Sequence, residues 1–336
     1  MGKSRIKKVL VTGGAGYVGA VLVPKLLSEG YEVVVLDAMF FTDMGLTAVK
    51  SHPGLTIIVG DIRDEIVVKK SLAGIDAVIH LASISNDPSG DLNPKLTVEV
   101  NYEANILLAR LAKKAGVQRF INVSSSSVYG VKSEPEVTED LFLEPLTIYS
   151  KAKADAEPVV MALAGPEFAV CTIRPATICG YSPKMRLDLS VNILTMHALT
   201  KGVITVFGGK QKRPNIHIAD ITDYYVELLK LPAEKISGGI YNAGYENHTI
   251  LGIAEMVRDF IGPEIKIEVT ETNDHRSYHI SPEKIKRELN LVPKKTLRDA
   301  VLDIKKKGDA GEINWNEINF YNMKKMKQLI EEGKVS

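Results

Sequence analysis

Six short apolar segments alternate with amphipathic segments through the first half of this chain, and this alternation constrains the fold more than any other feature. The apolar segments are rich in β-branched residues and lie at residues 7–12, 32–37, 55–61, 76–82, 119–125 and 168–174. Their apolar residues are nearly continuous, which is typical of strands buried on both faces of a parallel sheet. The sequence therefore predicts an α/β fold with a doubly wound parallel sheet.

A glycine-rich segment follows the first predicted strand and opens the first predicted helix. Its sequence, VLVTGGAGYVG, has the spacing G-x-x-G-x-x-G at Gly13, Gly16 and Gly19. The first glycine permits a tight turn, the second lets backbone amides approach a pyrophosphate, and the third lets helix and strand pack closely. Its place between strand and helix favours a Rossmann dinucleotide site over a plain turn.

An acidic residue ends the second predicted strand. Asp37 lies 24 residues after Gly13. A carboxylate at this place accepts hydrogen bonds from the adenosine ribose and repels a 2′-phosphate. No arginine follows in the segment AMFF at residues 38–41. The sequence therefore predicts NAD rather than NADP as the cofactor.

The alternation ends near residue 180, where loops lengthen and helical patterns predominate. We expect a Rossmann domain at residues 1–180 and a smaller, mostly helical substrate lobe at residues 181–309. Some segments of that lobe, at about residues 205–235, are expected to return to the Rossmann sheet. Residues 310–336 are predicted to form a basic, partly helical tail.

Two of the 12 tyrosines have a lysine four residues later, where both side chains share one face of a helix. Tyr321 and Lys325 lie far from any predicted strand. Tyr149 and Lys153 instead begin a helix after the fifth strand, at the sheet edge where α/β proteins bind ligands. We expect the Lys153 ammonium to lower the pKa of the Tyr149 phenol toward neutrality, so that Tyr149 can remove a hydroxyl proton.

These motifs together resemble the extended short-chain dehydrogenase/reductase family, which mostly acts on nucleotide-linked sugars. The resemblance covers roughly residues 7–305 and is carried by TGGAGYVG, the acid ending the second strand, GDIRD, HLAS, Asn101, the serine run and YSKAK. It implies that Lys153 also holds the nicotinamide ribose and that Asn101 is a structural or proton-relay residue. The cofactor contacts that we expect are Gly13, Gly16, Tyr17, Val18, Gly19, Asp37, Asp61, Ile62, Leu81, Ala82, Asn101, Tyr149, Lys153, Pro175 and Ile178.

The same resemblance selects one serine of the run VSSSSVYG. The family's catalytic Ser or Thr lies four residues before the tyrosine of V-Y-G, and counting back from Tyr129 leads to Ser125. Ser125 would hydrogen-bond the reacting oxygen and share its proton with Tyr149. Sugar 4,6-dehydratases of the family carry Asp and Glu at the next two positions, where this chain has Ser126 and Ser127. The sequence therefore argues against a 4,6-dehydratase of that type.

Substrate contacts are also implied by the resemblance. The segment SPKMRLDLSVN at residues 182–192 is similar to one in nucleotide-sugar enzymes that include GDP-heptose dehydrogenases. Arginine suits phosphate binding because its planar fork offers paired donors. The expected substrate contacts are Ser83, Ser85, Ser126, Arg186, Asn192, Arg213 and Arg276.

The composition indicates which partners and which cellular compartment to expect. A net charge of +1 indicates neither nucleic acid nor an anionic membrane as a partner. Two cysteines without a C-x-x-C spacing favour a reducing, cytoplasmic setting. His275 and His279 have a possible metal spacing, but no further ligands gather in the sequence, so we expect no metal. The family resemblance suggests a homodimer through the helices at residues 94–115 and 147–164.

The resemblance implies an NAD-dependent nucleotide-sugar epimerase, because epimerisation is the commonest activity among the enzymes that the chain resembles. It would oxidise a sugar hydroxyl, at C4, through Ser125, Tyr149 and Lys153, and return the hydride to the opposite face. A first alternative is a nucleotide-sugar dehydrogenase or reductase with net redox turnover, for example on a GDP-heptose. A second is a non-catalytic dinucleotide sensor, which would predict a broken Ser/Tyr/Lys set, whereas the set here is intact.

Overall fold

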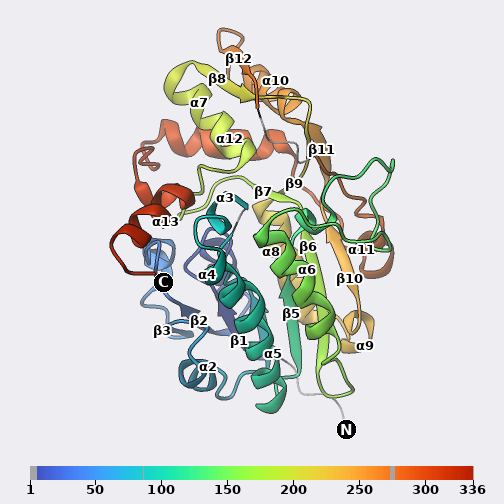
Figure 1. Ribbon diagram of the computed structural model, residues 1–336. Helices are drawn as coiled ribbons and strands as arrows, with labels where there is room; N and C mark the ends of the chain where they lie inside the picture. The colour runs from blue at the N-terminus through green and yellow to red at the C-terminus, as the bar shows by residue number, and fades with distance from the viewer. Residues whose placement is uncertain (1–5, 86, 273–276, 336) are drawn as a thin grey trace.

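A seven-stranded parallel sheet forms the centre of the protein. The computed structural model describes residues 6–85, 87–272 and 277–335 (Figure 1). The strand order is β10-β6-β5-β4-β1-β2-β3, and every neighbouring pair is parallel. The strands are β1 (Lys8–Thr12), β2 (Glu32–Asp37), β3 (Leu55–Val59), β4 (Ala77–His80), β5 (Arg119–Val123), β6 (Ala169–Pro175) and β10 (Ile240–Ala243). This architecture confirms the predicted doubly wound α/β fold.

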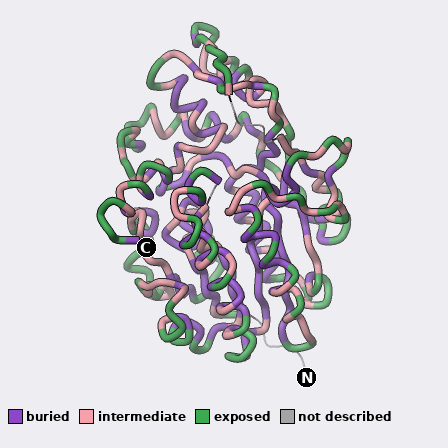
Figure 2. The backbone as a smooth tube through the Cα atoms, in the orientation of Figure 1, coloured by how far each residue is buried: buried purple, intermediate pink, exposed green. Residues whose placement is uncertain are grey.

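Helices cover both faces of the sheet and bury it, as the purple strands of Figure 2 show. Alternate residues of β1 enter different cores: Val9 and Val11 lie in one hydrophobic cluster and Leu10 in another. This two-sided burial explains the nearly continuous apolar pattern of the strands. The main helices are α1 (Gly19–Ser28), α2 (Glu65–Ser71), α4 (Pro94–Val98), α5 (Ala104–Lys114), α6 (Ile148–Met161) and α8 (Ile218–Lys230).

The segment at residues 94–115, predicted as one helix, is interrupted. A π-helical turn, η2 (Glu99–Glu103), separates α4 from α5. Such turns insert one extra residue and often occur at functional sites. The turn contains Asn101, whose side chain is fully buried.

The second half of the chain builds a smaller lobe and then returns to the sheet. The lobe contains α7 (Ser190–Lys201), α10 (Ile250–Ile261) and α12 (Leu297–Asp309), whereas α11 (Glu283–Leu289) packs against β10 of the main sheet. It also has two small sheets, β11-β9-β7 and β12-β8, formed by β7 (Thr177–Cys179), β8 (Val203–Phe207), β9 (Lys212–His217), β11 (Glu246–Thr249) and β12 (Lys266–Thr270). The chain comes back to the main sheet when α8 packs against α1 and β10 pairs with β6.

The last helix, α13 (Asn322–Glu331), lies against the half of the molecule that contains the main sheet. In Figure 1 it appears in red close to the blue strands β2 and β3. Met326 and Leu329 belong to the same hydrophobic cluster as Leu10 and Val34 of the main sheet. It also contacts the short helix α3 (Asp87–Gly90). The tail is therefore packed onto the main sheet, near the carboxyl ends of the strands.

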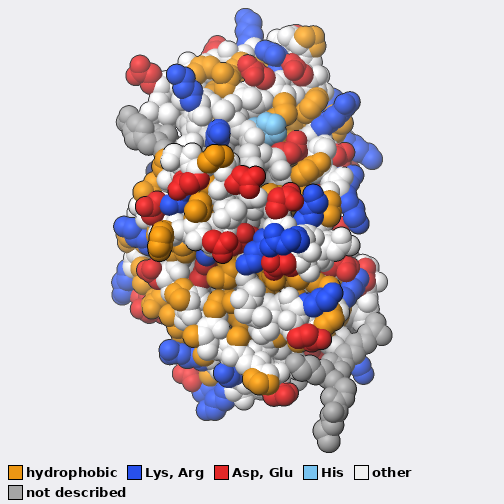
Figure 3. All heavy atoms as spheres, turned by 90° about the vertical axis from the view of Figure 1, so that its right-hand side faces the viewer, with side chains coloured by type: hydrophobic (Ala, Val, Ile, Leu, Met, Phe, Trp, Pro, Cys, Tyr) orange, Lys and Arg blue, Asp and Glu red, His pale blue; other side chains and the backbone are white. Residues whose placement is uncertain are grey.

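Charges of both signs are mixed on the surface that Figure 3 presents. Acidic and basic side chains alternate there over short distances, in keeping with the net charge of +1. A face of this kind lacks the single-sign field that steers polyanions. Among the residues that the structure describes, no helix combines the length and the apolarity needed to span a bilayer.

Candidate active site

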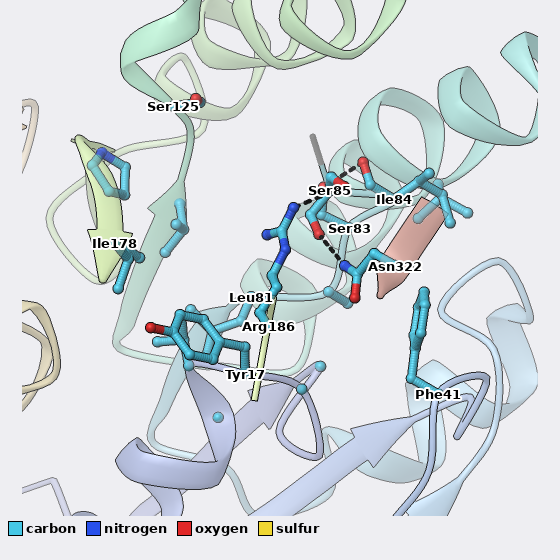
Figure 4. A pocket seen from close by; sticks show the side chains of 18 of the residues that line it. Tyr17, Phe41, Leu81, Ser83, Ile84, Ser85, Ser125, Ile178, Arg186 and Asn322 are labelled. Carbon is cyan, nitrogen blue, oxygen red and sulfur yellow. Dashed lines mark hydrogen bonds between the residues drawn. The ribbon is translucent and has the colours of Figure 1, made fainter. Parts of the chain in front are cut away.

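A cavity of about 300 Å³ opens at the carboxyl ends of the sheet strands. Ligands of doubly wound sheets bind at this edge, where the strand order reverses between β1 and β4. The walls come from the glycine loop, the ends of β2, β4 and β5, the start of α6, residues 175–189, and Asn322 (Figure 4). Segments far apart in the sequence therefore meet around one space.

The glycine loop has the geometry that its spacing predicts. Gly13 has a φ of 69°, and a Cβ there would lie 2.7 Å from the Ala82 nitrogen. A Cβ at Gly19 would lie 2.4 Å from the Gly14 oxygen, so any side chain would push the start of α1 away from the glycine loop. No side chain caps the start of α1, and its first turn holds no acidic residue. The free amides and the helix dipole at this end suit a dinucleotide pyrophosphate.

Asp37 connects the glycine loop to the end of β2 and lines the cavity. One carboxylate oxygen accepts a hydrogen bond from the Ala15 amide at 3.0 Å, and the other from the Met39 amide at 2.8 Å. Burial raises the pKa of this carboxyl, against the opposing effect of these two amide bonds. Asp61 and Ile62 also line the cavity, and Asp61 is paired with Arg63 at 2.9 Å.

Ser125, Tyr149 and Lys153 line the same cavity. Ser125 follows β5, and its Oγ accepts a hydrogen bond from the Ser127 amide at 3.2 Å. Tyr149 and Lys153 project from the first turns of α6, which begins after the capping residue Thr147. Tyr149 and Ser125 share a hydrogen bond, which favours the phenolate. The structure therefore brings the three predicted side chains together.

The electrostatics of the pair differ from the prediction. The pKa of Tyr149 is raised to about 12, because the effect of burial is larger than the opposite effect of the hydrogen bond with Ser125. Burial also lowers the pKa of Lys153 to about 8, and its Nζ donates to the Val123 carbonyl at 2.9 Å. The expected lowering of the Tyr149 pKa is therefore wrong for the protein alone, because burial disfavours the charged form of both groups. Added positive charge beside the phenol would be needed to favour the phenolate.

Two predicted contact residues lie behind the cavity wall. The Asn101 amide accepts from the Ile84 nitrogen at 2.9 Å and donates to the Ile84 oxygen at 3.0 Å, so it shapes the loop after β4. The Asn192 amide accepts from the Gly180 nitrogen and donates to the Tyr17 hydroxyl. Neither side chain lines the cavity. Both are buried and committed to neighbouring protein groups, so in this structure they hold loops in place.

The other expected substrate residues divide into two groups. Ser83, Ser85, Ser126 and Arg186 line the cavity. Figure 4 shows Arg186 beside the loop after β4, where its guanidinium donates to the Ser85 carbonyl at 3.3 Å.

Arg213 does not line the cavity, and its guanidinium stacks on the ring of Tyr278 at 5.1 Å. Tyr278 does line the cavity, so Arg213 contacts a residue of the cavity wall without lining the cavity itself. Arg276 and His275 lie outside the described residues. Within those residues, no three His, Cys, Asp or Glu side chains gather as metal ligands.

The remaining expected cofactor residues line the cavity. They come from the glycine loop, from the segment after β4, from the end of β6 and from β7, and they are Gly13, Gly16, Tyr17, Val18, Gly19, Leu81, Ala82, Pro175 and Ile178. The Tyr17 hydroxyl donates to the Gly180 carbonyl at 2.8 Å, and burial raises its pKa. This bond ties the glycine loop to the segment that enters the second lobe.

Sequence reasoning did not single out several polar side chains of the cavity wall, among them Asp87, Lys184, Tyr278 and Asn322. The Asp87 carboxylate accepts a hydrogen bond from the Thr147 hydroxyl at the start of α6. Lys184 stands two residues before Arg186, and only its proximity to that arginine could have suggested it. No sequence signal points to Asn322, because residues 310–336 carry no recognisable motif.

Comparisons with known proteins agree with this geometry. Residues 9–244 match the profile of the NAD dependent epimerase/dehydratase family. The chain is 31% identical to UDP-glucuronic acid decarboxylase 1 of Arabidopsis thaliana, over 90% of this chain and 69% of that protein.

Two solved structures are similar over nearly their whole length. DesIV, a dTDP-glucose 4,6-dehydratase from Streptomyces venezuelae with NAD bound, has a TM-score of 0.81 and 26% identity, covering 90% of this chain and 97% of that one. UDP-glucuronic acid 4-epimerase from Bacillus cereus, in complex with UDP-glucuronic acid and NAD, has a TM-score of 0.80 and 27% identity, covering 89% and 99%. The relatives named here catalyse three different reactions on nucleotide sugars.

Proposed function

Because this chain belongs to the NAD-dependent epimerase/dehydratase family, we propose that it is a nucleotide-sugar epimerase that inverts C4 of the sugar. The family makes the protein an NAD-dependent enzyme of the extended short-chain dehydrogenase/reductase type. Its relatives use related substrates for epimerisation, dehydration and decarboxylation. The choice among these reactions therefore rests on the side chains around the reacting carbon.

Each side chain of the catalytic set has a role in the proposed reaction. NAD, when bound, supplies a hydride acceptor that later returns the hydride. Tyr149 removes the proton of the sugar hydroxyl, and Ser125 hydrogen-bonds the same oxygen. The Lys153 ammonium has three donors, of which one is used on the Val123 carbonyl. The other two can hold the cofactor ribose and keep positive charge near the phenol. Inversion requires the keto sugar to turn over before Tyr149 returns the proton.

The observation that carries the proposal is the chemistry beside Ser125. Elimination of water needs groups that remove a carbon-bound proton and protonate a leaving hydroxyl, and carboxylates serve this purpose. Here the neighbouring side chain is the Ser127 hydroxyl, 3.0 Å from the Ser125 Oγ. Asp87 also lines the cavity, but it accepts a hydrogen bond from Thr147 at the start of α6. Hydroxyls beside Ser125 support oxidation and return of the hydride without elimination.

A panel of UDP-, GDP-, dTDP- and CDP-sugars, including a uronic acid, tests the reaction. We expect one sugar to be inverted at C4, as measured by NMR, without net formation of reduced nicotinamide at 340 nm. Stoichiometric reduced cofactor would instead identify a dehydrogenase. Release of carbon dioxide from the uronic acid would identify a decarboxylase, and loss of water would identify a dehydratase.

The proposed role of Tyr149 predicts that removal of its hydroxyl oxygen strongly lowers the rate of turnover. Tyr149→Phe is expected to lower kcat by about 10²- to 10⁴-fold, because it removes the general acid–base group. Tyr245→Phe is a matched control, since Tyr245 is 44% exposed and does not line the cavity. The measurement is the initial rate on the sugar identified by the panel. Full turnover by Tyr149→Phe would contradict the mechanism.

A further inference from the structure

A buried lysine faces the cofactor cavity without a carboxylate partner. Lys184 is 2% exposed and lines the cavity. Its Nζ donates to the Asn322 Oδ1 at 3.0 Å and lies 4.8 Å from the centroid of the Phe41 ring. Across the described residues, no acidic side chain reaches ion-pairing distance of this ammonium. Burial lowers its pKa to about 7, helped by the nearby Arg186 and opposed by Asp188 and Asp37.

A charge in this position is costly for the protein alone. Removing an ammonium from water costs several kcal/mol unless other charges or hydrogen bonds replace the lost hydration. Lys184 has three donors and one observed acceptor, plus the face of one aromatic ring. The remaining donors border the cavity. An anionic oxygen inside the cavity would satisfy them.

The surroundings of Lys184 identify which anion fits. Its Cβ lies beside Gly45, which in turn packs against the Ala15 carbonyl of the glycine loop. The Ser182 hydroxyl donates to the Tyr17 carbonyl at 2.8 Å, which fastens this segment over the same loop. The loop offers free amides to a pyrophosphate from one side. Lys184 therefore lines the same cavity as these amides, on a segment that is fastened to the glycine loop.

Asn322 holds the ammonium and links three parts of the chain. Its Oδ1 accepts from Lys184, and its Nδ2 donates to the Ser85 hydroxyl at 3.2 Å (Figure 4). It is the first residue of α13, whose Met326 and Leu329 are buried in the core of the main sheet. The final helix thus fixes the position of a cation that belongs to the second lobe.

We propose that Lys184 binds a phosphate oxygen of the NAD pyrophosphate, and that Asn322 positions it from the final helix. Neither residue follows from the glycine, Asp37 or Tyr/Lys motifs. The pair closes the cofactor site with one side chain from the second lobe and one from the tail.

Binding measurements on Lys184→Met test the proposal without any sugar substrate. We expect NAD affinity, measured by calorimetry, to fall about 10- to 100-fold, as for loss of one charge-assisted hydrogen bond. ADP binding should fall by a similar factor, and adenosine binding should change by less than about twofold, because adenosine has no phosphate. Lys184→Arg should keep most of the affinity, since it keeps the charge. Lys201→Met, at the exposed end of α7, is the control.

Thermal unfolding distinguishes a binding role from a structural one. Methionine fills a similar volume without charge, so Lys184→Met should leave the Tm of the cofactor-free protein unchanged or raise it. A lower Tm together with unchanged NAD and ADP affinity would overturn the proposal.

Asn322→Asp is an independent variant that keeps Lys184 itself. The new carboxylate should form an ion pair with the ammonium and compete with the phosphate. We expect weaker NAD binding with no loss of Tm, and wild-type affinity in this variant would contradict the role of Lys184. These outcomes do not depend on the sugar reaction, so failure of the epimerase proposal and failure of this one remain separate results.

Discussion

At the scale of single residues, burial sets the starting condition for catalysis. The Tyr149 phenol and the Lys153 ammonium both lose water on entering the cavity wall, and their pKa values move apart, to about 12 for the phenol and about 8 for the ammonium. A phenolate is then stabilised only by hydrogen bonds and by nearby positive charge. Small changes of charge beside Ser125 should therefore have large effects on the pH profile.

Ser127→Glu tests this sensitivity. The Ser127 hydroxyl is 3.0 Å from the Ser125 Oγ, which shares a hydrogen bond with Tyr149. A carboxylate there disfavours the phenolate, so the pKa of Tyr149 should rise by about one unit. The pH at which kcat rises should then move upward by about one unit, and kcat at pH 7 should be about tenfold lower.

Ser127→Gln is the neutral control for this prediction, because it has the same size without the charge. The measurement is kcat as a function of pH for both variants. Identical profiles for the glutamate and the glutamine would show that charge at this position does not reach the phenol.

At the scale of elements, a buried polar network holds α6 against the sheet. Arg174 of β6 pairs with Glu157 of α6 at 2.6 Å, and both side chains are almost fully buried. Arg174 also donates to the Tyr129 hydroxyl at 2.7 Å, and Tyr129 donates to Asn242 of β10 at 2.8 Å. Glu157, one turn later on the same helix, opposes the lowering of the Lys153 pKa by burial. The network therefore positions α6 and favours the charged form of Lys153.

Arg174→Met should be strongly destabilising. It leaves the Glu157 carboxylate buried without its partner, which costs about 3–5 kcal/mol. The double variant Arg174→Met with Glu157→Met should recover most of the loss, because no buried charge remains unpaired. Urea unfolding of the single and double variants measures the coupling. A cost below about 1 kcal/mol for the single variant would be typical of a surface pair and would contradict this account.

Most elements of the first half could be predicted because their signals are local. The six predicted strands correspond to β1 to β6 with ends within two residues. The π-helical turn at Glu99–Glu103 was missed, because one inserted residue leaves the apolar pattern nearly unchanged. The four-residue strand β10 was also missed, since it has a single neighbour and is too short to show a period.

At the scale of the whole molecule, the candidate site combines residues that belong to sequence motifs with residues that belong to none. Gly13, Asp37 and Tyr149 could be predicted because each stands at a fixed offset from a strand. Lys184 and Asn322 could not, because they meet across 138 residues of sequence. Such pairs depend on how the second lobe and the tail fold back over the sheet.

A homodimer through α4, α5 and α6 remains a prediction at this scale. Val98 at the end of α4 is 37% exposed and would be covered by a second copy. Light scattering should report about twice the chain mass of 36.8 kDa. Val98→Asp should shift the protein toward the monomer at low concentration, whereas Val131→Asp, on an exposed loop, should not. A monomeric wild-type protein would contradict the prediction.

The position of Asn322 also has a consequence for biosynthesis. Ribosomes make the glycine loop long before residue 322, so a nascent chain can assemble the first strands of the main sheet while one wall of the nucleotide cavity is still missing. Newly made chains should therefore bind the dinucleotide tightly only after translation has passed α13.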